Sequence, residues 1–140
     1  TANGQISPVK NVTVGTQVSG IIKARQFTEG SVVQTGQTLY QIDPAIYDAA
    51  HGEAAARLAS AEAALAAANA RAERYATLVD SEAVSRQDID DTRASARQAR
   101  ASVAQARAAL QSANVTLRYT RIIAPISGRI GRSSVTPGAL

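Results

Sequence analysis

The residues best equipped for chemistry are one histidine, His51, and three clustered aspartates, Asp88, Asp90 and Asp91. Close carboxylates can share a proton or bind a metal, and a histidine can transfer protons near neutral pH. The aspartates, however, fall in the first turn of a predicted helix, where acidic residues favour the helix dipole. His51 has no second histidine beside it, so we expect plain packing on a helix, with a pH-responsive hinge beside Gly52 as the alternative.

The composition excludes several classes of site. The 140 residues contain no cysteine, which rules out thiol chemistry, disulfides and cysteine-based zinc sites. Only Lys10 and Lys23 are lysines, which makes a cofactor attached through lysine improbable. We therefore predict that the protein is not an enzyme and binds no cofactor or metal.

A different kind of chemistry is available around residue 80. Arg74 and Leu78 are four residues apart, which places them on one face of a helix as a forked hydrogen-bond donor beside an apolar side chain. Ser85 follows seven residues later, where the next helix is predicted to begin. The alternative interpretation is that Leu78 packs locally, Ser85 only caps the helix and Arg74 is a solvated charge.

A row of arginines follows on the second predicted helix, with no acidic residue between Asp91 and Leu117. We consider three roles: a contact between protomers, a nucleic-acid stripe and a solvated helix flank. A net charge of +4 admits nucleic acid, but aromatic residues are only 4% of the chain and no binding motif is present, which argues against it. The row consists of Arg93, Arg97, Arg100 and Arg107.

The elements that must position these residues follow from composition. Residues 5–43 are rich in β-branched residues and glycine, which predicts short strands with tight turns. Asp43 and Pro44 then open a long helix that is expected to end near residue 80. Ser85, with Asp88 three residues on, begins a second helix that extends to about Leu117. From Tyr119 the β character returns.

Heptads predict how the two helices pack. Apolar residues recur every seven positions on both helices, with alanine at many of the companion positions, so we expect a two-stranded antiparallel coiled coil with a small-residue interface. The seam residues are Leu58, Leu65, Ala72, Val79, Tyr47, Ala54, Ala61, Ala68 and Tyr75 on the first helix, and Ile89, Ala96, Val103, Leu110, Leu117, Ala99, Ala106 and Ala113 on the second.

The β segments contain a repeat at an offset of 108 residues. It matches Gly20 with Gly128 and Ile22 with Ile130, and continues to Thr136 and Gly138. Two copies of one turn-strand-turn unit on either side of the helices predict a single small β-sandwich into which the helical pair is inserted.

Several motifs together resemble the periplasmic adaptor, or membrane fusion, subunits of RND-type multidrug efflux pumps. They are QVSGII at 17–22, EGSV at 29–32, LYQIDP at 39–44, LRYT at 117–120 and APISGRIG at 124–131. The resemblance implies an α+β fold: a split biotinyl/lipoyl-like β-sandwich with an inserted, long antiparallel α-helical coiled-coil hairpin. Residues 1–43 would form the first half of the β domain, 44–118 the hairpin, and 119–140 a second half that stops short of its closing strand.

The same resemblance implies partners and a location. Such adaptors link an inner-membrane transporter to a TolC-like outer-membrane channel in a ring, expected to be hexameric, and they reside in the periplasm, attached to the inner membrane by an N-terminal lipid or anchor. The segment from Arg74 to Ser85 resembles the family's channel-docking motif, which assigns channel docking to Arg74, Leu78 and Ser85.

Alternatives within and outside this class remain open. The opening residues 6–16 lean toward adaptors of ABC-type exporters, so an adaptor of an ABC-type or type I exporter is one alternative. A structural coiled-coil protein without a transport role is another.

Overall fold

The computed structural model describes residues 11–79 and 84–132. Its elements are β1 (Ile22–Arg25), β2 (Val32–Val33), β3 (Thr38–Ile42), α1 (Ala45–Thr77), α2 (Arg86–Arg118), β4 (Arg121–Ile123) and β5 (Gly128–Arg129). They divide into two compact units, one holding all the strands and the other holding both helices, Ala45–Arg118. The fold class is therefore α+β, as predicted.

The two ends of α1 have identifiable local features. Pro44 directly precedes α1 and cannot donate a backbone hydrogen bond, which suits a helix start. At the other end, the hydroxyl of Thr77 donates to the carbonyl of Arg74 at 2.7 Å. α1 ends at Thr77, short of residue 80, and the predicted seam position Val79 is 50% exposed because it lies past the helix end.

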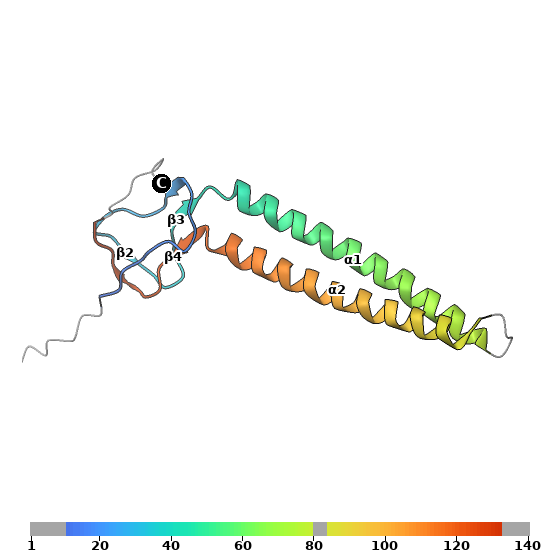
Figure 1. The fold of residues 1–140 in the computed structure, drawn as a ribbon. Helices are drawn as coiled ribbons and strands as arrows, with labels where there is room; N and C mark the ends of the chain where they lie inside the picture. The colour runs from blue at the N-terminus through green and yellow to red at the C-terminus, as the bar shows by residue number, and fades with distance from the viewer. Residues whose placement is uncertain (1–10, 80–83, 133–140) are drawn as a thin grey trace, which may run out of the picture. The chain divides into compact units, whose positions relative to one another are not determined.

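α1 and α2 lie side by side and run in opposite directions (Figure 1). The predicted seam positions between Tyr47 and Tyr75 are buried or half-buried, and so are those between Ile89 and Leu117. The most buried of them are small or β-branched: Ala54, Ile89, Ala96 and Val103, each 6–9% exposed. Thr92 is buried among them and satisfies its hydroxyl by donating to the carbonyl of Ile89 at 2.8 Å.

The strands form two small antiparallel sheets that join the chain segments on either side of the helices. One sheet has the order β1-β3-β4, and the other pairs β2 with β5. Thr38 is opposite Ile123 and Gln41 opposite Arg121 in the first sheet, and Val32 is opposite Arg129 in the second. The segments before and after the helical insertion are therefore neighbours in both sheets.

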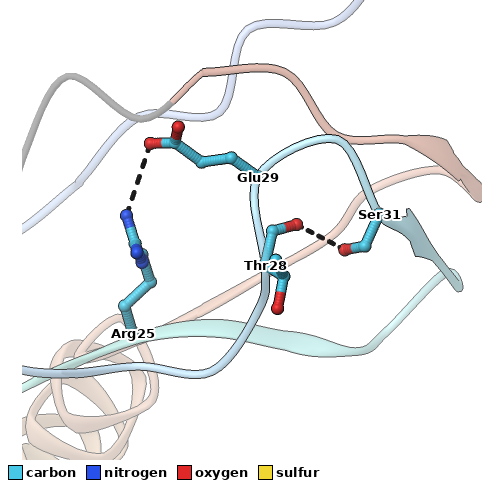
Figure 2. A network of polar contacts seen from close by, with 4 residues as sticks. All are labelled: Arg25, Thr28, Glu29 and Ser31. Atoms are coloured by element: carbon cyan, nitrogen blue, oxygen red, sulfur yellow. Dashed lines mark hydrogen bonds and ion pairs between the residues drawn. The ribbon is translucent and has the colours of Figure 1, made fainter.

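The core of the β unit is apolar and tightly packed at one point. Leu39 and Ile42 on β3 are each 1% exposed. A side chain at Gly20 would place its Cβ 2.6 Å from Cγ2 of Ile42, so glycine is required there for this close approach. The turn after β1 is held by an ion pair of 3.3 Å between Arg25 and Glu29 (Figure 2).

One expectation for the β segments is wrong, and part of another concerns residues outside the described ranges. The β-branched residues Val12 and Val14 were expected in a strand, yet they lie outside any strand, because among residues 11–79 the strands begin at Ile22, and both side chains are exposed. A strand needs a partner strand, and none of the described residues pairs with this segment. Of the repeat, Ile22 is buried and Ile130 half-buried, whereas Thr136 and Gly138 lie outside the described residues.

Candidate functional site

The end of α1 presents a charged and an apolar side chain to solvent. Arg74 lies in the last turn and is exposed. Leu78 follows the helix, its backbone N–H donating to the carbonyl of Tyr75 at 3.1 Å, and it is 40% exposed. An exposed leucine four residues after an exposed arginine is suited to a protein contact, because the leucine gains from desolvation while the arginine gives direction.

Ser85 starts α2 through a reciprocal cap. Its hydroxyl oxygen accepts the N–H of Asp88 at 3.0 Å, and its own N–H donates to Oδ2 of Asp88 at 3.1 Å. This confirms the predicted capping box, which satisfies two backbone groups that the helix leaves unpaired. Ser85 is exposed, and it lies at the same end of the helix pair as Arg74 and Leu78, with the undescribed residues 80–83 between them.

A hollow near this end was not anticipated from the sequence. It has a volume of about 340 Å³ and lies between α1 and α2, lined by Arg71, Tyr75, Asp88, Asp91 and four small residues. Nη2 of Arg71 donates to the Tyr75 hydroxyl at 3.4 Å, and the guanidinium lies 5.3 Å from the centre of the Tyr75 ring. This hydrogen bond raises the pKa of Arg71 above its usual value, and the charge of Asp88 adds to the effect. The i,i+4 spacing of Arg71 and Tyr75 was the available signal.

The predicted row of arginines is exposed, but its members differ in their partners. Arg107 forms an ion pair of 3.6 Å with Glu62 across the two helices. Arg93, Arg97 and Arg100 form no ion pair with other described residues. The structure thus assigns Arg107 an intramolecular contact and leaves the other three facing solvent.

The remaining polar candidates show no catalytic arrangement. His51 is half-buried on α1, and Asp88 is engaged in the helix cap, whereas Asp90 and Asp91 are exposed. Within residues 11–79 and 84–132, no group of three acidic or histidine side chains could hold a metal ion. In the same ranges, neither helix offers an apolar stretch of the length needed to cross a membrane.

The β unit contains a larger, mainly apolar hollow of about 810 Å³. Its walls include the segment from Val12 to Gly20 together with buried residues of the sheet such as Leu39, Ile42 and Ile122. Among the described residues that line it, the titratable ones are Tyr40 and Arg132.

Comparison with known proteins places these features in a family. Residues 10–140 match the family described as "RND MFP, barrel-sandwich hybrid domain". The match covers both the strands and the helices.

Individual relatives agree with this family. Multidrug export protein AcrE of Escherichia coli K12 is 50% identical over 137 residues, which cover 98% of this chain and 36% of AcrE. The antibiotic efflux pump periplasmic linker protein ArpA of Pseudomonas putida is 51% identical over 98% of this chain and 33% of ArpA. This chain therefore spans about a third of the length of these relatives.

A solved structure supports the fold. The membrane fusion protein Spr0693 of Streptococcus pneumoniae R6 matches 91% of this chain and 55% of its own with a TM-score of 0.71, at 22% identity. The family match and the relatives confirm the resemblance found in the sequence motifs. This chain belongs to the family of RND membrane fusion proteins and carries their barrel-sandwich hybrid domain.

Proposed function

We propose that this chain is part of a periplasmic adaptor that links an inner-membrane RND transporter to a TolC-like outer-membrane channel for drug export. The observation that carries the proposal is the family match over residues 10–140, supported by relatives named as an efflux linker and a multidrug export protein. The role is mechanical: the adaptor is not an enzyme and needs no cofactor, because the transporter supplies the energy. We place it in the periplasm, attached to the inner membrane by an N-terminal lipid or anchor.

In this proposal the two units have separate tasks. Residues 1–43 and 119–140 form the halves of a lipoyl-like β domain, and residues 44–118 form an antiparallel coiled-coil hairpin. The pairing of β3 with β4 and of β2 with β5 supports the split domain, because each pair joins the two halves. The low exposure of the heptad positions supports the coiled coil.

Channel docking is assigned to Arg74, Leu78 and Ser85. All three are exposed and belong to the same end of the helix pair. Leu78 would supply apolar contact area and Arg74 a forked donor for carbonyl or carboxylate groups of the channel. Ser85 would act mainly through the cap that shapes the start of α2.

The adaptor is further proposed to assemble into a ring, hexameric by family resemblance, in which arginines of α2 contact neighbouring protomers. The exposed side chains of Arg93, Arg97 and Arg100 support this role. Arg107 supports it less, since Glu62 already engages it.

The test is photo-crosslinking in cells from a probe at Leu78 of the full-length protein. A probe at Glu53, which is exposed near the other end of α1, is the matched control. We expect an outer-membrane channel subunit in the Leu78 adduct and none in the Glu53 adduct. Adducts at Leu78 that contain only other copies of the adaptor, or no adduct, would overturn the docking assignment.

A further inference from the structure

The hollow near the end of the helix pair is formed by two facing rows of side chains. Members of each row are three or four residues apart, so they lie on one face of their helix. α1 ends at Thr77, α2 begins at Arg86, and both antiparallel helices have 33 residues, so these two ends are level. Six residues in from those ends, Arg71 is level with Thr92. The rows are Ala68, Arg71 and Tyr75 on α1, and Asp88, Thr92 and Ser95 on α2.

Within this hollow, Arg71 contacts the last turns of its own helix. Its Nη2 donates to the Tyr75 hydroxyl at 3.4 Å, and the guanidinium carbon lies 5.3 Å from the centre of the Tyr75 ring. The backbone carbonyl of Tyr75 in turn accepts the N–H of Leu78 at 3.1 Å. Arg71 therefore contacts the same residue that holds the backbone of Leu78 at the helix end.

Arg71 also interacts with the first turn of α2. Asp88 lines the same hollow, and its negative charge raises the pKa of Arg71, after the larger effect of the hydrogen bond with Tyr75. Asp88 is also the partner of Ser85 in the reciprocal cap that starts α2. A single guanidinium thus has one partner on each helix, and each of these partners hydrogen-bonds a residue assigned to docking.

We propose that Arg71 is a positioning residue that ties the last turns of α1 to the first turn of α2 and so fixes Leu78 relative to Ser85. The proposal rests on the docking function proposed above and adds a residue that the docking assignment leaves out. Arg71 acts through Tyr75 and Asp88 and does not itself contact the channel.

The effect of this link is confined to the helix ends. Arg71 is exposed, so water screens its contacts and they add little to the stability of the whole helix pair. Helix ends open more easily than helix centres, and a weak link there changes how often the two ends separate. The test must therefore measure the ends themselves and not the overall unfolding.

Distance measurement by electron paramagnetic resonance tests the link in the purified full-length protein. Spin labels are attached to Ala76→Cys and Gln87→Cys, two exposed and level positions in the last turn of α1 and the first turn of α2. Residues 1–140 contribute no cysteine of their own. In Arg71→Gln the fraction of molecules with a longer separation between the labels should rise about threefold.

The matched control is Arg57→Gln. Arg57 is exposed and lies on the same helix two heptads before Arg71, but it pairs at 2.6 Å with Glu53 of its own helix. This control should leave the distance distribution unchanged. An unchanged distribution in Arg71→Gln, or equal broadening in both variants, would overturn the proposal.

A conservative variant tests the cause. Arg71→Lys keeps a positive charge beside the Tyr75 ring and Asp88, so it should retain most of the narrow distribution seen with arginine. A distribution for Arg71→Lys as broad as that for Arg71→Gln would contradict an electrostatic link between the helices.

The crosslinking probe at Leu78 connects the link to docking. In cells, Arg71→Gln should lower the yield of the channel adduct about threefold, and Arg57→Gln should not change it. A lower yield without broader distances would mean that Arg71 contacts the channel itself, and broader distances with an unchanged yield would mean that docking does not need the link. Either result overturns the proposal. Absence of the channel adduct in the unsubstituted protein would instead reject the docking assignment, while the distance measurement still decides the link between the helices.

Discussion

The β unit and the helix pair are stabilised in different ways. The β unit is anchored by two large aliphatic residues, Leu39 and Ile42, which are each 1% exposed. In the helix pair the most buried side chains are 6–9% exposed, and two of them, Ala54 and Ala96, are alanines. A small-residue seam buries little apolar area per layer, so helix propensity must contribute more to the stability of the helices. The comparison teaches that the β unit is stabilised by a few fully buried aliphatic side chains, whereas the helix pair depends more on local helix propensity.

The largest expected effect is in the β unit. Ile42→Ala should cost about 2–5 kcal/mol, because it removes a fully enclosed side chain and leaves a cavity. Hydrogen exchange should show lost protection in β1, β3 and β4, with α1 and α2 protected as before. Ile46→Ala, at a position 80% exposed, is the control and should change stability by less than about 0.5 kcal/mol. Equal loss of protection in the helices would show that the two units do not differ as described.

A smaller effect is expected at the start of α2. Ser85→Ala should destabilise the first turn of α2 by about 1 kcal/mol, because the hydroxyl that accepts the Asp88 N–H is lost. Hydrogen exchange is the measurement. Ser85→Asp should restore the amide protection of the first turn of α2, since aspartate also caps helices. Drug resistance measured in strains with the same variants separates the capping role of Ser85 from its proposed docking role. If Ser85→Asp restores protection but not resistance, Ser85 has a role beyond capping the helix.

The smallest effect is expected for the exposed pair of Glu62 and Arg107. A double-mutant cycle with Glu62→Gln and Arg107→Gln should give a coupling below about 1 kcal/mol, because both side chains are more than half exposed and screened by solvent. Chemical denaturation at low and high salt is the measurement, and the coupling should shrink in salt. A coupling of several kcal/mol would mean that the helix pair is held by charge rather than by its seam.

The sequence predicted the helices well because their signals are local. The cap at Ser85, Pro44 before α1 and the heptads all act within a few residues, and the ends of both helices agree with prediction to within about three residues. Val79 was misplaced because the heptad alone does not show where a helix stops.

The strands and the side-chain partners were harder to predict. Val12 and Val14 have strand-forming side chains, yet strand formation depends on a partner elsewhere in the chain, which composition does not reveal. The pair between Glu62 and Arg107 required the register of the two helices, which no local signal supplies. The docking role of Arg74, Leu78 and Ser85 stays a prediction, since exposure and capping agree with docking and with its alternative.

The place where the helices are inserted has a consequence for how such a chain can vary. β3 and β4 are adjacent antiparallel strands, and the N–H of Ile42 donates to the carbonyl of Thr120 at 2.8 Å, so the insertion leaves and returns at neighbouring points of one sheet. A loop closed in this way can change length at little entropic cost to the strands. Adding or removing seven residues at matching levels of α1 and α2 would preserve both the seam and the sheet. The length of the helix pair can therefore change by whole heptads without redesign of the β unit.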